Sequence, residues 1–322
     1  MFLCLPEPSV GLTEDIFSGI YYSKNNESTS ISADFLRAVH GATTSRSRGF
    51  FFPSVDQAQH LLKIILEWKP PASNRLNPFW IKPGYEVKTY IGQVVADACL
   101  QQLDSTSWSP EQSKNLVDWI DSSDFASTLI CIPELVRLDV DLLNWAQSKL
   151  QRALMSRDRD TIHFGIYAVA RWLEMREDEK ISPLPQGIVK LAVSNVTNRR
   201  HFQLHHAIHL CDLLAIHEAL TADDLKLLAD AMEDLWIETQ YEVWDVQSPE
   251  TFALSFIRAN CVLLSRTLIS LGLTFDALTK WVEEAALDPL PEVRLALDGI
   301  YPERSEDKKE RKRVRRRVAR ST

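Results

Sequence analysis

Five histidines fall within one short stretch of the chain, and two of them have the spacing of a metal site. They are His201, His205, His206, His209 and His217. On a helix, His205 and His209 lie one turn apart, and Asp212 follows three residues on, so the three side chains project within a narrow arc. Two imidazoles and a carboxylate can bind zinc or iron. A polar helix flank whose histidines face water or a partner explains the same pattern, and both interpretations stay open.

A second pattern, Glu86-Val87-Lys88 after Pro83-Gly84, has the Glu-x-Lys spacing of a nuclease strand. In such a site the Glu holds Mg²⁺ and the Lys orients a water molecule. A further acidic residue on an adjacent strand is needed, and none is convincingly placed. The apolar residues at 87, 91, 94, 95 and 98 instead have helical spacing. The pattern therefore favours a helix over a nuclease site.

Three aspartates, Asp118, Asp121 and Asp124, are spaced for one face or the end of a helix. Paired carboxylates perform acid–base chemistry only where burial couples them. The chain outside its last twenty residues is strongly acidic, so we expect a solvated acidic face here.

The motifs of the common enzyme classes are missing from the sequence. It contains no Gly-x-Gly-x-x-Gly, Walker-type Gly-Lys-Ser/Thr, Gly-x-Ser-x-Gly, His-Glu-x-x-His or Cys-x-x-Cys. Its five cysteines are far apart and odd in number, which fits neither a disulfide framework nor a zinc-ligand pattern. Buried thiols in a reducing compartment are expected. The sequence predicts no cofactor and favours a protein that is not an enzyme.

The strongest functional signal is the basic segment at 303–322, which has ten Lys/Arg and four Asp/Glu and so carries +6. The whole chain carries −8, which leaves −14 on residues 1–302. The candidate binding residues are Lys308, Lys309, Arg311, Lys312, Arg313, Arg315, Arg316 and Arg317. Dense Lys/Arg can neutralise phosphates, direct nuclear import in a eukaryote, or dock on an acidic protein. A solubilising tail, or one that contacts the acidic body, is the alternative.

The elements that position these residues are predicted to be helices. Glycine is scarce at 10 residues in 322, whereas sheet proteins need it at tight turns. Ser109-Pro110-Glu111 and Ser248-Pro249-Glu250 combine a capping serine, a first-turn proline and a glutamate near the positive helix end. Thr221 with Asp224 has the spacing of a capping box. These signals predict helix starts.

Apolar residues at steps of three and four then form a series of stripes at 143–154, 162–173, 204–215, 225–236, 253–268 and 278–285. Four tryptophans, Trp145, Trp172, Trp236 and Trp281, fall inside these stripes, so we expect them in the core rather than on a base-stacking surface. The short polar turns between stripes predict antiparallel neighbouring helices.

The second helices of the predicted hairpins begin near Ser122, Arg157, Asn198, Ser248 and Asp288, at intervals of about 35 to 50 residues. Residues 288–297 read Asp-Pro-Leu-Pro-Glu-Val-Arg-Leu-Ala-Leu, which resembles the Asp-Pro turn and Val-Arg helix start of HEAT repeats. The resemblance covers residues 110–300 and implies an all-α, right-handed stack of antiparallel helical hairpins, a HEAT-like α-solenoid. An irregular helical bundle is the alternative.

One HEAT-like family, the deoxyhypusine hydroxylases, holds a di-iron site with several His-Glu pairs. Only His217-Glu218 matches that pattern here, and one pair cannot make such a site. A solenoid presents a long surface suited to extended partners. The resemblance therefore implies a scaffold or adaptor that binds a protein through its helical surface. A nucleic-acid-associated subunit that uses the tail, and a metal-dependent enzyme that uses the His-rich helix, are the alternatives.

Three parts of the chain are predicted: an irregular or helical cap at 1–83, the helical-repeat domain at 84–302 and the basic tail at 303–322. Within the cap, residues 54–68 have helical spacing, and Pro70-Pro71 should end that helix. The N-terminus lacks the basic and apolar regions of a signal peptide, and no segment approaches the roughly 20 apolar residues of a membrane span. The expected location is cytoplasmic, or nuclear in a eukaryote.

Overall fold

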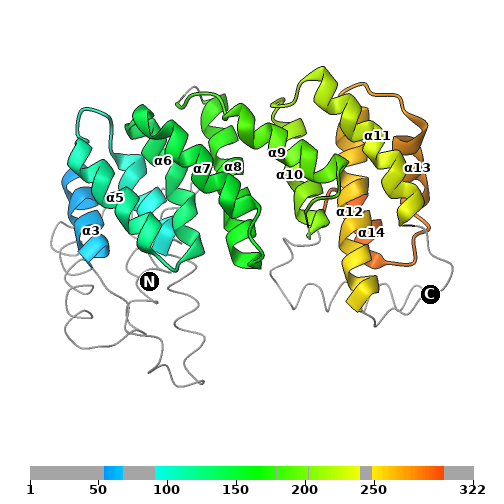
Figure 1. Cartoon of the computed structure of the whole chain (residues 1–322), viewed down its shortest axis with the longest axis horizontal. Coiled ribbons are helices and arrows are strands. Elements are labelled where there is room, and N and C mark those ends of the chain that lie inside the picture. Colours follow the sequence, from blue (N-terminus) through cyan, green and yellow to red (C-terminus); the bar gives the residue numbers. More distant parts are fainter. Residues whose placement is uncertain (1–53, 68–90, 179, 202, 240–248, 301–322) are drawn as a thin grey trace, which may run out of the picture. The chain divides into compact units, whose positions relative to one another are not determined.

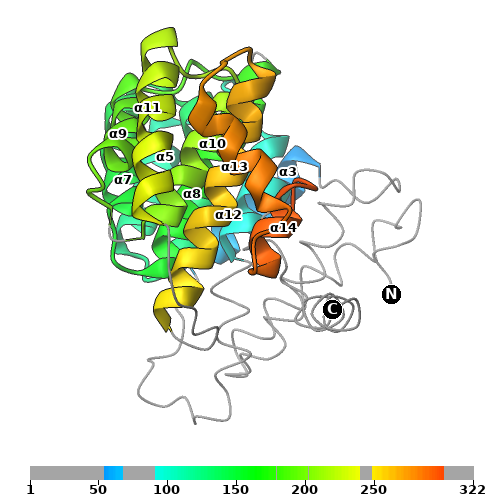
Figure 2. The ribbon, with the colours of Figure 1, turned by 90° about the vertical axis from the view of Figure 1, so that its right-hand side faces the viewer.

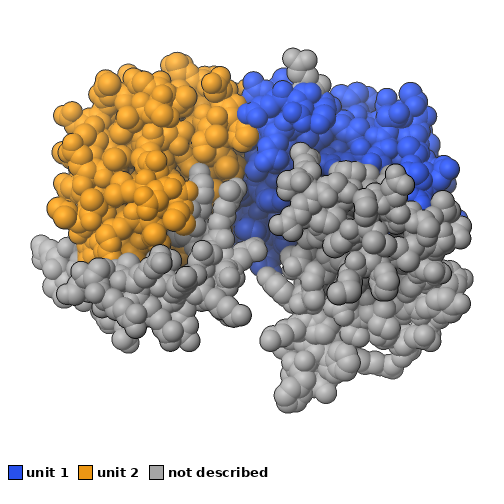
Figure 3. Space-filling view, turned by 180° about the vertical axis from the view of Figure 1, so that it is seen from behind, with its two compact units in different colours: residues 1–183 blue, residues 184–322 orange. Residues whose placement is uncertain are grey.

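The computed structural model describes residues 54–67, 91–178, 180–201, 203–239 and 249–300 (Figure 1). All regular elements in these segments are helices, with no strand among them, so the all-α prediction is confirmed for the part of the chain described. The chain divides into two compact units, residues 1–183 and 184–322 (Figure 3). This division falls inside the segment predicted as one helical-repeat domain. None of the helices in the described segments has the length and apolar composition to cross a membrane.

Unit 1 contains five α-helices and several short helical turns within its described residues. They are α3 (Val55–Glu67), the π-helical turn η5 (Val95–Cys99), η6 (Leu100–Gln102), α5 (Pro110–Ser122), η7 (Ala126–Ile130), α6 (Cys131–Leu138), η8 (Val140–Leu142), α7 (Leu143–Leu154) and α8 (Arg159–Glu177). Helix α8 packs against η7, α6 and α7, and α6 also contacts η5 and η6. Helix α3 packs on η5 and η6 and touches α5. Short turns therefore connect α3 to the core of the unit.

Unit 2 contains α9 (Gln186–Thr197), α10 (Leu204–Ile216), α11 (Ala222–Glu238), α12 (Pro249–Ser270), α13 (Asp276–Ala285) and α14 (Pro291–Ala296) in its described residues (Figure 2). Helices α9, α11 and α13 pack one after another, and so do α10, α12 and α14. Each helix of the first series also packs against the next helix along the chain: α9 on α10, α11 on α12 and α13 on α14.

The predicted helix starts at Ser109 and Thr221 are confirmed as complete capping boxes. Ser109 accepts from the backbone of Gln112 while the Gln112 side chain accepts from Ser109, and Pro110 occupies the first turn of α5. Thr221 and Asp224 make the same exchange at the start of α11. Each box satisfies amides that the first helical turn leaves without partners. Helix α12 starts at Pro249, as the Ser-Pro-Glu pattern predicts.

The predicted core stripes are largely buried. Trp172 and Trp281 are almost completely inaccessible, as expected, whereas Trp145 and Trp236 are half-buried. The indole of Trp172 donates to the carbonyl of Ser182 at 2.9 Å, so its polar edge has a partner in the core.

Arg171 of α8 joins three elements of unit 1 through largely buried ion pairs. Its Nη1 lies 2.5 Å from the Asp97 carboxylate in η5, and its Nη2 lies 2.7 Å from Glu134 in α6. Burial acts to lower the pKa of Arg171, but the charges of Glu134 and Asp97 raise it above its usual value, so the guanidinium stays charged. Because a buried charge without a partner is costly, these elements stay together.

Arg137 of α6 extends the same network. Its Nε lies 2.8 Å from Glu134, and its other nitrogens donate to the carbonyls of Leu100 at 2.7 Å and Leu103 at 3.0 Å. These carbonyls belong to η6 and the residue after it, where a helix end lacks intrahelical partners. Arg137 therefore ties the end of this helical segment to α6.

Unit 2 has a comparable buried arginine, Arg258 of α12. Its Nε lies 2.9 Å from the Asp288 carboxylate, and its Nη1 donates to the Thr239 carbonyl at 3.3 Å. The guanidinium carbon lies 5.4 Å from the ring centroid of Trp236 and 5.1 Å from that of Trp281, within cation–π range. Asp288, the first residue of the Asp-Pro motif, therefore holds α12 against the turn that precedes α14.

Gly92 marks a close backbone contact in unit 1. A Cβ atom at this position would overlap the carbonyl group of Ser127 and lie 2.7 Å from the Thr128 nitrogen. The Gly92 carbonyl also accepts from the Cys131 thiol at 3.3 Å. Only glycine lets the helical segment before η5 approach η7 this closely.

We expect Gly92→Ala to destabilise unit 1 by about 1–3 kcal/mol or more, because rigid backbone faces the added methyl group. Gly165→Ala is the matched control, since its Cβ would lie 3.2 Å from the Ala153 side chain and only a small adjustment is needed. Urea unfolding of each variant measures the change in free energy. Equal stability of the two variants would contradict the close contact.

Candidate binding groove

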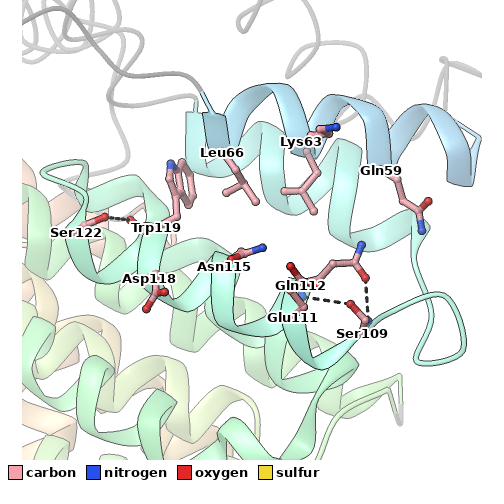
Figure 4. A pocket seen from close by; sticks show the side chains of 11 residues that line it. Gln59, Lys63, Leu66, Ser109, Glu111, Gln112, Asn115, Asp118, Trp119 and Ser122 are labelled. Atoms are coloured by element: carbon pink, nitrogen blue, oxygen red, sulfur yellow. Dashed lines mark hydrogen bonds between the residues drawn. The ribbon is translucent and has the colours of Figure 1, made fainter.

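An open groove of about 690 Å³ runs between α3 and α5 in unit 1 (Figure 4). One face of α3 and one face of α5 form its walls. The lining residues are Gln59, Leu62, Lys63 and Leu66 on α3, and Ser109, Glu111, Gln112, Asn115, Asp118, Trp119 and Ser122 on or just before α5. Steps of three and four along each helix place these side chains on the same side. Volumes of this size are typical of pockets that hold a small ligand or a few side chains of a partner.

The floor of the groove is apolar. Leu62 is buried, while Leu66 and Trp119 are half-buried, and the Trp119 ring reaches towards Leu66 across the groove (Figure 4). Such partly covered apolar surface gains free energy when another apolar group removes it from water, at roughly 25 cal/mol per Å². The floor therefore favours binding of apolar side chains.

The rim of the groove carries opposite charges on its two walls. Lys63 is exposed on α3, whereas Glu111 and Asp118 are exposed on α5. The side chain of Asn115, also exposed, lies between these two carboxylates along the helix. A ligand with a cationic group beside α5 would complement this arrangement.

Helix α5 is held in place by hydrogen bonds on the side that faces away from the groove and in the loop before its first residue. Ser113 is buried and donates to the Asp139 carboxylate at 2.5 Å, while the Trp108 indole donates to Ser113 at 2.8 Å. Gln59 of α3 donates to the Ser107 carbonyl at 3.2 Å, which ties α3 to the loop before α5. The walls are thus fixed before a ligand binds, which reduces the ordering cost of binding.

The polar side chains of the described lining are suited to contacts with a ligand. Among these described residues there is neither histidine nor cysteine beside the serines to act as the base that a nucleophile needs. Glu111 and Asp118 are seven residues apart, about 10 Å along a helix, and both are exposed to water, so they do not form a coupled acid–base pair. The chemistry of the lining therefore supports binding.

Comparison of the chain with protein-family models, with curated proteins and with solved structures found no match.

The predicted binding residues of the basic tail lie outside the described residues, as do Glu86 and Lys88 of the nuclease-like pattern. The three residues of the predicted metal site lie on α10. His205 and His209 are half-buried, whereas Asp212 is buried and accepts from the Thr267 hydroxyl of α12 at 2.6 Å.

The His-rich helix contacts an aromatic ring and a hydroxyl group of α12. The rings of His205 and His206 are 4.3 Å apart, and His205 lies 5.6 Å from the Phe256 ring of α12. Within the described segments, no group of three or more His, Cys, Asp or Glu side chains is placed to hold a metal ion. The Asp212–Thr267 hydrogen bond instead joins α10 to α12.

The three aspartates Asp118, Asp121 and Asp124 have different surroundings in the structure. Asp121 is bound by Lys149 at 2.8 Å and by the Trp145 indole at 3.1 Å, both from α7. Partial burial raises the pKa of Asp121, but the hydrogen bonds from Lys149 and Trp145 outweigh this effect and lower it below its usual value. Asp124 is exposed, and Asp118 lines the groove. The prediction of a solvated acidic face is therefore incomplete, because Asp121 links α5 to α7.

Four cysteines, Cys99, Cys131, Cys211 and Cys261, are free and buried, as expected for thiols that serve as core side chains. Burial raises the pKa of each thiol above its usual value. Because the thiolate is the reactive form, none of the four has the character of a nucleophile or metal ligand.

Proposed function

We propose that this protein is a non-enzymatic scaffold or adaptor that binds a segment of a protein partner in the groove between α3 and α5. The observation that carries this proposal is the groove itself, with its apolar floor and its charged rim on fixed walls. The bound segment would place apolar side chains against Leu66 and Trp119. A Lys or Arg would lie beside Glu111 and Asp118, and an acidic group beside Lys63 would complete the match.

The proposal includes a HEAT-like α-solenoid as the architecture of the scaffold. Its support is the packing in unit 2, where alternate helices pack in two series and consecutive helices pack across them. The Asp288-Pro289 turn, with its buried Arg258 contact, adds local support from the residues that carry the resemblance. In such stacks each hairpin contacts mainly its neighbours, which leaves helix faces available to partners.

We expect Asn115→Arg to abolish partner binding, because it adds a bulky cation in the middle of the groove beside the position of the partner's own cation. Asn115 is exposed, so folding should be unaffected. Asn144→Arg on α7 is the matched control, since Asn144 is also an exposed helical asparagine and does not line the groove. In quantitative affinity purification from host extract, the wild type and Asn144→Arg should enrich the same partner proteins to the same extent. Asn115→Arg should enrich these proteins less, by about tenfold or more. Retention of every partner by Asn115→Arg would contradict the proposed groove.

A second candidate function, association with nucleic acid, rests on the +6 charge of residues 303–322. The tail has no aromatic residues for base stacking, so any binding should be non-specific and electrostatic.

Fluorescence anisotropy with a short DNA and a short RNA tests this candidate on the full chain and on residues 1–302. We expect binding by the full chain alone, with affinity falling by about a hundredfold or more between about 50 and about 200 mM salt. Failure of both chains to bind near physiological salt would exclude this function and leave the protein scaffold.

A further inference from the structure

The two most exposed large apolar residues in the described segments lie at the ends of neighbouring helices in unit 2. Ile237, in the last turn of α11, is 66% exposed, and Leu287, in the turn after α13, is 87% exposed. Helices α11 and α13 pack side by side, with the Trp236 and Trp281 rings edge to face at 4.8 Å. We call Ile237 and Leu287, with the carboxylates around them, the Ile237–Leu287 patch.

Arg258 brings the two halves of this patch to the same end of the helix pair. One arginine side chain contacts both the Thr239 carbonyl, at 3.3 Å, and the Asp288 carboxylate, at 2.9 Å. Thr239 lies two residues after Ile237, and Asp288 directly follows Leu287. Because Arg258 and Asp288 are buried, this junction fixes the chain on both sides of the patch. The two exposed apolar side chains therefore lie next to backbone positions that Arg258 contacts.

The surroundings of the two apolar residues are predominantly acidic. Exposed carboxylates of the last turns of α11 and α13 are Glu233, Asp234, Glu238, Glu283 and Glu284. Arg199 lies 2.6 Å from Glu238 and 3.5 Å from Asp234, and Lys280 is the exposed cation of α13. The five carboxylates outnumber these two cations, and Asp234 and Glu238 are one turn apart on the same helix, where like charges repel. A cationic segment with apolar side chains would complement the patch.

The chain contains a segment with this chemistry. Residues 308–317 include eight Lys/Arg, and Val314 and Val318 are four residues apart, the spacing that would place both on one face of a helix. The tail begins just after Ile300, which belongs to the same unit as α11 and α13. Val314 is the fourteenth residue after Ile300, which gives a reach of up to about 45–50 Å, whereas α13 with its ten residues is only about 15 Å long. The tether is therefore long enough for the tail to reach the patch of its own molecule.

We propose that residues 308–318 dock on the Ile237–Leu287 patch of the same molecule. The two valines contact Ile237 and Leu287, and the surrounding Lys/Arg side chains pair with the carboxylates of α11 and α13. This contact does not depend on the groove of unit 1. It holds the basic segment on the protein, so that a polyanion must compete with the carboxylates of the patch before it binds the tail.

Limited trypsin digestion of the full chain tests the docking directly, because trypsin cleaves at the Lys and Arg residues of the tail. We compare the wild type with Ile237→Ser/Leu287→Ser at low salt, and follow cleavage at the Lys and Arg residues of 308–317 by mass spectrometry. Both substituted residues are exposed, so the fold should tolerate the change. When docking opens and closes faster than cleavage, the cleavage rate reports the undocked fraction. We expect the tail of the double variant to be cut at least about fivefold faster than that of the wild type.

Leu227→Ser is the control, because Leu227 is a 50% exposed apolar residue near the other end of α11. Its tail should be cut at the wild-type rate. About 0.5 M salt should remove most of the difference between the wild type and the double variant, since it screens the ion pairs. Equal tail cleavage in the wild type and the double variant at low salt would overturn the proposal. Protection that rises with protein concentration would also overturn it, because the occupant would then be the tail of a second copy.

Discussion

Buried arginines that bridge several elements are the interaction on which the described structure most depends. A guanidinium removed from water is tolerated only when carboxylates or carbonyls replace its hydration. Arg171 meets this requirement with Asp97 and Glu134, and Arg258 meets it with Asp288 and Thr239. In each unit the position of one charged side chain therefore constrains elements that lie far apart in the sequence.

The proposed groove depends on this constraint indirectly. Helix α3 forms one wall and packs on η5 and η6, and these turns are held by Asp97 and by the contacts of Arg137 with the carbonyls of Leu100 and Leu103. The glycine contact at Gly92 brings the same segment against η7. The geometry of this exposed groove is in this way determined by polar contacts beneath the surface. The same holds in unit 2, where Arg258 supports the exposed Ile237 and Leu287.

Helix positions were predictable from sequence because their signals are local. The capping residues Ser109 and Thr221 and the spacing of apolar residues depend on contacts within one or two helical turns. The ion pairs were not predictable: Arg171 and Asp97 are 74 residues apart, and periodicity identifies a buried face without naming what covers it. The groove was missed for the same reason, since its lining comes from two helices whose pairing is a tertiary contact. Asp212 shows that one spacing can have two explanations, because the spacing that suggests a metal ligand also suits a buried carboxylate that accepts a hydrogen bond from Thr267.

A double-mutant cycle on Arg171 and Glu134 tests most directly whether the buried bridge holds unit 1 together. Arg171→Met, Glu134→Gln and the double variant would be compared by hydrogen exchange of α6 and α8 in urea, which reports on unit 1 alone. Each single variant should lose about 3–5 kcal/mol, because it removes one charge from the network of Arg171, Glu134, Asp97 and Arg137, and the double variant should lose less than the sum by about 1–3 kcal/mol. Losses that add to within about 0.5 kcal/mol would contradict the coupling and with it the central role of this interaction.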